Sequence, residues 1–236
     1  MQRIKLEINP GMKPGILSDI ADLVLGRRCV GCNEGGTILC PECDAHIKGH
    51  SHIARDFRFD EIQEGLRIPL AVACVYAPPM STLIYSYKDA HVPALAPVLS
   101  RYLESALDEL STSGVPKATL TPIPTRSAAI RRRGFDAMEL ISRNLIKRGH
   151  VVEHMLTDNR TAGHSKALDS RSRLREVQDA FAITPTTQRL IKKANPIIIF
   201  DDVTTTGSTL KEAAMTLMQA GVQIVGVAAI AGARKR

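Results

Sequence analysis

The sequence predicts an α/β protein in which a mostly parallel sheet carries helices on both faces, preceded by a small cysteine-rich module. Three observations support this class. From Leu70 onward, strand-like and helix-like runs alternate, as in proteins whose parallel strands are joined by helices. The run PIIIF at 196–200 has no polar alternation, which is typical of a strand buried on both faces. Four of the five cysteines lie in one stretch, CVGCNEGGTILCPEC.

The elements follow in order along the chain. Apolar residues recur at helical spacing in residues 14–26, so we expect a helix there. Residues 54–67 are polar, and we interpret them as a linker. The strand-like runs that follow are LAVACVY, ATLTPIP, VVEHMLT, PIIIFDDV and VQIVGVAAI. The helix-like runs are PMSTLIYSYK, ALAPVLSRYLESALDEL, DAMELISRNLIKRG and STLKEAAMTLMQAG. We therefore expect a helix and cysteine module over 1–53, the linker over 54–67 and the α/β domain over 68–236.

The composition excludes a disordered chain. The 236 residues are 44% hydrophobic and 23% charged, and because Trp is absent the core must come mainly from aliphatic side chains. No run approaches the length of a membrane span, and the N-terminus lacks the pattern of a secretory signal, so we expect a cytoplasmic protein.

The chain carries an excess of positive charge. Its formal net charge is +7, with basic clusters at 131–133 and 234–236. Such an excess favours partners that bear phosphate, either small metabolites or nucleic acids. For each cluster the alternative is a solvated face or tail.

The cysteine spacing predicts a metal site. Two CxxC pairs, formed by Cys29, Cys32, Cys40 and Cys43, suit a tetrahedral Zn²⁺ bound by four thiolates. Two disulfides are the alternative, but a cytosolic protein keeps its thiols reduced. Four protein thiolates leave no open coordination position, so we expect a structural, zinc-ribbon-like module whose folding depends on the metal.

Two adjacent acidic residues follow the most apolar strand. Asp201 and Asp202 come directly after IIIF, where a parallel sheet binds its ligands, and the next residues are nearly all Thr, Ser and Gly. A Gly-containing turn at a helix N-terminus suits a phosphate, while carboxylates accept hydrogen bonds from vicinal hydroxyls. A ribose 5-phosphate group fits both halves. The alternative is an ordinary helix N-cap beside two surface aspartates.

The stretch IIIFDDVTTTGST resembles the signature for 5-phosphoribosyl pyrophosphate (PRPP) in type I phosphoribosyltransferases. This resemblance implies the type I phosphoribosyltransferase fold, with Asp201 and Asp202 as the catalytic pair that binds the ribose hydroxyls. It also implies a 5′-phosphate loop made of Thr204, Thr205, Thr206, Gly207, Ser208 and Thr209.

Nearly the whole chain resembles the ComF/GntX competence-associated family, in which a helix and Cys₄ module precede such a domain. The matching stretches are YSYKD around Lys88, TPIPTRSAAIRRRGF at 121–135 and RLREVQDAF at 173–181. The resemblance implies that Arg131, Arg132 and Arg133 face the diphosphate of PRPP and its Mg²⁺, with Lys88 as a further substrate-binding candidate.

Some positions depart from the family pattern. RGFNQ of the family reads RGFDA here, with Asp136 and Ala137 in the last two places, and Glu176 replaces an Asn. These departures leave the PRPP signature unchanged and concern contacts to a second substrate.

The family resemblance leaves more than one function open. The first is an enzyme that transfers or hydrolyses the phosphoribosyl group of PRPP, with a biological role in DNA uptake. The second is a non-enzymatic adaptor of DNA uptake that binds single-stranded DNA or partner proteins, and a third is a PRPP-sensing regulator. Related folds often form homodimers, which is the assembly the resemblance suggests.

Overall fold

The structure is a computed structural model that describes residues 28–49, 51–60, 63–159, 180–191 and 195–233. The helix expected at 14–26, most of the stretch RLREVQDAF and the basic cluster at 234–236 lie outside the described residues.

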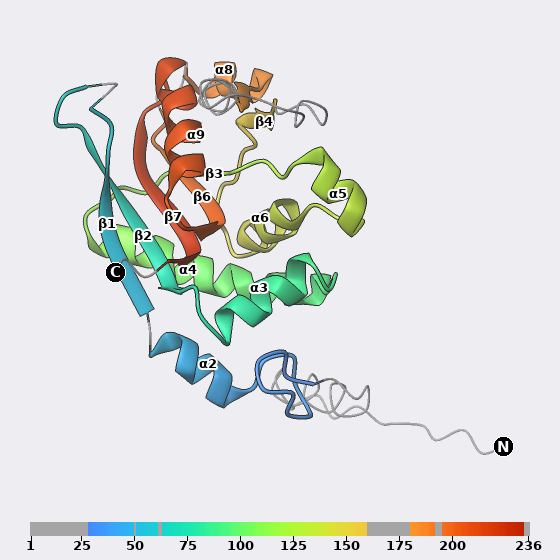
Figure 1. Ribbon diagram of the computed structural model, residues 1–236. Coiled ribbons are helices and arrows are strands. Elements are labelled where there is room, and N and C mark those ends of the chain that lie inside the picture. Colours follow the sequence, from blue (N-terminus) through green and yellow to red (C-terminus); the bar gives the residue numbers. More distant parts are fainter. Residues whose placement is uncertain (1–27, 50, 61–62, 160–179, 192–194, 234–236) are drawn as a thin grey trace, which may run out of the picture.

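A five-stranded sheet forms the centre of the molecule (Figure 1). Its strand order is β1 (Ser51–Arg58), β2 (Arg67–Val75), β7 (Ile224–Gly232), β6 (Ile197–Thr204) and β3 (Thr119–Pro122). Strands β2, β7, β6 and β3 are parallel, and only the edge strand β1 is antiparallel to its neighbour. The carboxyl ends of the parallel strands therefore share one edge of the sheet.

Helices cover both faces of this sheet (Figure 1). One face carries α3 (Met80–Lys88), the 3₁₀ turn η1 (Pro93–Leu95), α4 (Ala96–Thr112) and α6 (Ala137–Lys147). The other face carries α9 (Ser208–Gln219), α8 (Pro185–Ile191) and a two-stranded sheet of β4 (Leu156–Asp158) and β5 (Phe181–Ile183). The predicted α/β class with a mostly parallel sheet is confirmed.

Strand β6 is buried on both faces, as its apolar sequence predicts. Ile198 and Phe200 belong to the core under α4, whereas Ile197 and Ile199 belong to the core under α9. All four residues are at most 5% exposed. A strand held in this way sets the position of the residues that follow it.

Two expectations differ from the structure. Residues 51–58, which overlap the predicted linker at 54–67, form the edge strand β1, and a turn closed by Phe59 N donating to Leu66 O leads to β2. An edge strand tolerates charged residues on its open face, which hides the strand pattern in the sequence. The predicted strand VVEHMLT contributes only a parallel bridge between Val152 and Leu120 before it leaves the sheet to form β4.

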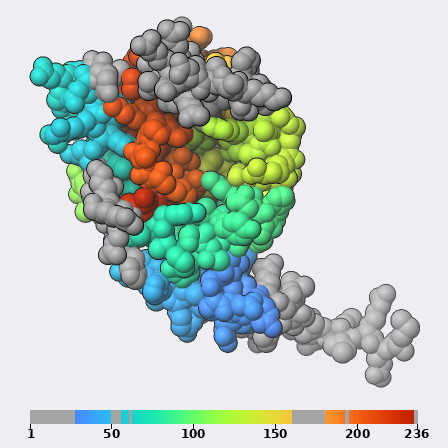
Figure 2. All heavy atoms as spheres, viewed as in Figure 1, coloured from blue at the N-terminus to red at the C-terminus, as the bar shows by residue number. Residues whose placement is uncertain are grey.

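The N-terminal module lies at one end of the molecule, against α3 (Figures 1 and 2). Its helix α2 (Pro41–Lys48) is tied to α4 because Tyr102 Oη donates to Asp44 Oδ1 at 2.6 Å. A Cβ on Gly31 would lie 3.0 Å from Pro79 Cβ, so the cysteine loop packs closely on the start of α3. Among the described residues, no helix has the length and apolar character needed to span a membrane.

Candidate functional site

The two aspartates stand at the carboxyl end of β6. Asp201 pairs in register with Ala229 of β7 and is partly buried, and Asp202 is only 4% exposed. The backbone N–H of Asp202 donates to Asp201 Oδ1 at 2.8 Å. Lys88 Nζ, at the last turn of α3, forms an ion pair with Asp202 Oδ2. The structure thus brings Lys88 and both aspartates into one cluster.

The Asp201 carboxyl group has a raised pKa. Burial raises the pKa of Asp201 to about 8, and the negative charge of Asp202 acts in the same direction, whereas Lys88 opposes the shift. Asp201 is therefore mostly protonated at neutral pH, while the Lys88 ammonium neutralises Asp202. The cluster of Lys88, Asp201 and Asp202 therefore carries little net charge, which explains how two adjacent aspartates lie at the edge of a core.

A turn with exposed hydroxyls follows the aspartates. Thr204 is buried, whereas Thr205 and Thr206 are exposed. Thr206 Oγ1 and Ser208 Oγ lie 3.0 Å apart, and the backbone N–H of Ser208 donates to Thr206 Oγ1 at 3.4 Å. These hydroxyls and the first turn of α9 lie next to each other along the chain.

Gly207 is the N-cap residue of α9, and only glycine suits its position. Its φ of +80° lies in the left-handed region. A Cβ at this position would lie 2.4 Å from ring atoms of Phe57. Because glycine has no side chain, Gly207 itself caps none of the first amides of α9, although the Ser208 N–H donates to Thr206 Oγ1. Phe57 supports the loop from β1, a contact that the interpretation of 54–67 as a linker missed.

The arginine cluster lies on α5 (Ser127–Arg133), a helix without a buried residue. Arg131 and Arg132 are exposed. Arg132 Nη2 lies 3.5 Å from Asp89 Oδ1 with both side chains well exposed, so this pair contributes little stability. Arg133 differs, because its Nε is buried and has no hydrogen-bond partner among the described residues.

Tyr87 connects the arginine segment to the aspartates, and the sequence analysis did not single it out. It is fully buried, its Oη donates to Ala137 O at 2.6 Å, and its ring packs on Phe135 with centroids 5.5 Å apart. Burial raises the pKa of Tyr87, the charges of Asp202 and Asp136 reinforce this, and Arg133 opposes it. The charges of Asp202 and Arg133 both act on the Tyr87 hydroxyl, so Tyr87 lies near the aspartate pair and near the arginine segment.

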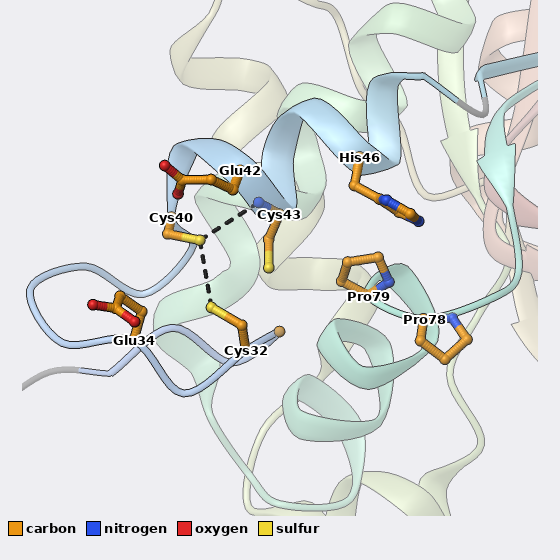
Figure 3. A pocket seen from close by; sticks show the side chains of 9 residues that line it. Cys32, Glu34, Cys40, Glu42, Cys43, His46, Pro78 and Pro79 are labelled. Carbon is orange, nitrogen blue, oxygen red and sulfur yellow. Dashed lines mark hydrogen bonds between the residues drawn. The ribbon is translucent and has the colours of Figure 1, made fainter.

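The four cysteines of the N-terminal module form a second cluster. The sulfur atoms of Cys29, Cys32, Cys40 and Cys43 all lie within 4.8 Å of one another, and none forms a disulfide. Cys40 N donates to Cys29 Sγ at 3.3 Å, and Cys43 N donates to Cys40 Sγ at 3.4 Å. Figure 3 shows Cys32, Cys40 and Cys43 turned toward one another, beside an open hollow of about 600 Å³ that also reaches Pro79. The four thiols are close enough to bind one metal ion such as zinc.

The electrostatics of this cluster suit a cation. Burial opposes ionisation of Cys29, yet hydrogen bonds from the backbone amides of Cys40, Cys32 and Gly31 lower its pKa to about 6. Burial and the neighbouring sulfurs raise the pKa of Cys43. A divalent cation would remove the repulsion that keeps the second thiol protonated.

The chain is similar to proteins that are named for DNA utilization and for competence. No model of a protein family matches it. It is 30% identical over 193 residues to DNA utilization protein YhgH of Escherichia coli (strain K12), covering 80% of this chain and 82% of that protein. It is 30% identical over 196 residues to DNA utilization protein YhgH of Salmonella typhi. It is 25% identical over 235 residues to competence protein F of Haemophilus influenzae, covering 87% of this chain and 97% of that protein. The chain belongs to the ComF family, with DNA utilization protein YhgH and competence protein F among its relatives.

Proposed function

We propose that this protein binds PRPP together with Mg²⁺ at the carboxyl end of β6 and transfers or hydrolyses its phosphoribosyl group. The observation that carries the proposal is one continuous segment, in which Asp201 and Asp202 lie in the carboxyl-terminal half of the buried strand β6 and Gly207 opens α9 a few residues later. Ligands of parallel α/β sheets bind beyond the carboxyl ends of the strands. A ligand with vicinal hydroxyls and a phosphate uses both halves of this segment.

The phosphate half is the start of α9. Gly207 offers no side-chain cap, so the amides that follow Ser208 can donate to phosphate oxygens, which the helix dipole also attracts. The hydroxyls of Thr206 and Ser208, now bonded to each other, add donors from the exposed turn. Thr205 and Thr209 complete the proposed 5′-phosphate loop.

The ribose half is the aspartate pair. Asp202, with Asp201 once it is ionised, accepts hydrogen bonds from the ribose hydroxyls and stabilises positive charge on the ribose as its bond to the diphosphate breaks. Bound Mg²⁺ would neutralise charge on the departing diphosphate. Lys88 and the arginines of α5 would supply further positive charge to the diphosphate.

For the N-terminal module we propose a structural zinc ion held by the four cysteine thiolates. Support comes from the proximity of the sulfurs and from the lowered pKa of Cys29. Within residues 28–49 the buried hydrophobic residues are few, and three of them are cysteines of the cluster, so the metal would supply much of the folding free energy of this segment.

The names of the relatives suggest the biological context. Because they are called DNA utilization and competence proteins, we propose a role linked to DNA uptake for this chain as well. A homodimer and contacts with other proteins of DNA uptake belong to the same proposal.

A second candidate function is single-stranded DNA binding without catalysis. It is favoured by Tyr85, which is 60% exposed on α3 one turn before Asp89, the residue that meets Arg132. An exposed aromatic ring beside a basic helix suits base stacking and phosphate contacts. A PRPP sensor without turnover would use the proposed PRPP site.

Turnover and DNA binding can be separated with one variant. We expect wild-type protein with PRPP and Mg²⁺ to release pyrophosphate as water takes the phosphoribosyl group to give ribose 5-phosphate, and Asp202→Asn to lose this activity. DNA binding through phosphates should survive Asp202→Asn and weaken steeply with salt. Release of pyrophosphate by the variant at the wild-type rate would refute the catalytic proposal. PRPP binding without release of pyrophosphate would favour the function of a PRPP-sensing regulator.

A further inference from the structure

The segment that carries α5 is closed by a hydrogen bond between its two ends. Thr125 precedes the helix and Asp136 follows it, and Thr125 Oγ1 donates to Asp136 Oδ1 at 2.7 Å. None of the residues of α5 itself is buried. The position of this helix therefore depends on how its two ends are held.

Asp136 has a further role at the next helix. It is the N-cap residue of α6, and the same Oδ1 accepts from the backbone N–H of Met138 at 3.0 Å and of Glu139 at 3.2 Å. One carboxylate oxygen thus joins Thr125 to the start of α6. Since α6 packs against α4 and the sheet, the end of the segment is fixed to the rigid part of the protein.

Tyr87 also contacts the junction between α5 and α6. Its hydroxyl donates to Ala137 O, and its ring packs on Phe135. Tyr87 directly precedes Lys88, which pairs with Asp202. The junction between α5 and α6 is therefore anchored beside the aspartate pair.

Arg133 has a side-chain hydrogen-bond donor that the described residues do not satisfy. It is the last residue of α5, and Gly134 follows in a left-handed conformation with φ of +81°. Its Nε is buried without a hydrogen-bond partner among the described residues. A buried guanidinium N–H without a partner is costly, and an anion is its natural acceptor.

We propose that Thr125 and Asp136 are positioning residues that hold Arg133 as a diphosphate-binding residue next to the aspartate pair. The inference rests on the proposed function in taking the anion to be the diphosphate of PRPP. It goes beyond that function because it assigns a role to Thr125 and Asp136, neither of which would touch the ligand.

The test uses full-length protein and two probes, inorganic pyrophosphate with Mg²⁺ and ribose 5-phosphate. Thr125→Val keeps the volume and loses the hydroxyl, and Thr125→Ser restores it. We expect Thr125→Val to bind pyrophosphate about tenfold more weakly, as for a lost hydrogen bond to a charged group, and Thr125→Ser to bind within about twofold of wild type. Ribose 5-phosphate, which lacks the diphosphate, should bind all three proteins alike.

Several outcomes would overturn the inference. These are equal pyrophosphate affinity in Thr125→Val and wild type, an equal loss for both probes, or no pyrophosphate binding by wild type. Arg133→Gln is the second variant, and unchanged pyrophosphate binding there would overturn the inference even if Thr125→Val did not fold. If wild type binds pyrophosphate but neither ribose 5-phosphate nor PRPP, the proposed function fails. The effect of Thr125→Val on pyrophosphate then still decides the positioning role.

Discussion

Lys88 and Asp202 form an ion pair that joins the last turn of α3 to the end of β6. The Asp202 side chain is 6% exposed and that of Lys88 is 23% exposed, so solvent screens the pair only partly. Beside it, Asp201 retains its proton at neutral pH because of its raised pKa. This balance allows two adjacent carboxyl groups to lie together at the edge of the core.

Removing the lysine should destabilise the protein. Lys88→Met leaves the buried Asp202 carboxylate without its cation, and we expect a loss of about 3 kcal/mol in the free energy of unfolding. Urea denaturation at neutral pH measures it. The double variant Lys88→Met/Asp202→Asn, which removes both charges, should recover most of the loss. A Lys88→Met protein as stable as wild type would show that the pair has no structural role.

The raised pKa of Asp201 predicts how stability depends on pH. Its folded pKa of about 8 exceeds the value of about 3.9 for an unfolded aspartate, so the folded state holds the proton more tightly. The resulting stabilisation is fully present below about pH 4 and is lost as the pH rises through about 8. Asp201→Asn keeps the neutral form at every pH. We expect the stability of wild type to fall relative to this variant between about pH 4 and pH 8 and to level off above that. If the melting temperatures of wild type and Asp201→Asn change equally with pH over this range, the raised pKa of Asp201 is wrong.

Gly207→Ala tests the backbone conformation at the start of α9 and its contact with Phe57. The substitution strains a residue with φ of +80° and places a methyl group against the ring of Phe57. We expect a loss of at least about 2 kcal/mol in unfolding free energy. Gly114→Ala is a matched control, because its φ is +87° and no atom lies within 4 Å of the added Cβ. The excess loss at Gly207, measured by chemical denaturation, reports the contact with Phe57. Equal losses at the two positions would rule that contact out.

Metal removal should act first on the N-terminal module. We expect the purified protein to contain one zinc ion, and chelation to increase hydrogen exchange in residues 28–49 before the sheet is affected. Metal analysis and exchange mass spectrometry measure these effects. Tyr102→Phe is a useful comparison, since it loses the hydrogen bond to Asp44 and should sensitise the module to the chelator. Unchanged exchange after verified removal of the metal would exclude a structural zinc site.

The fold class could be predicted from the sequence because the patterns that indicate it lie in short stretches of the chain. The apolar run of β6 required burial on both faces, and the structure places Ile198 under one layer of helices and Ile199 under the other. The spacing of the cysteines likewise predicted that their sulfurs meet. An apolar run of this kind needs burial on both faces, and two closely spaced CxxC pairs need a common ligand or disulfides, so each pattern is compatible with few structures.

The pairings between distant segments could not be predicted in the same way. Nothing in the residues around Lys88 indicates that it meets Asp202, since that contact depends on how α3 packs beside the sheet. Tyr87 looks like an ordinary core residue until its hydrogen bond to Ala137 is seen. Phe57 was hidden in a stretch whose charges suggested a linker, although an edge strand needs an apolar face on one side only.

The most direct test of the central claim is calorimetric titration of PRPP into zinc-loaded protein, with and without Mg²⁺. Asp202→Asn is the variant, and Asp108→Asn, at an exposed position on α4, is the matched control. We predict Mg²⁺-dependent binding in wild type and in Asp108→Asn, and a loss of at least about tenfold in affinity in Asp202→Asn. Absence of binding to well-folded wild-type protein, or equal binding by all three proteins, would contradict a PRPP site at the end of β6.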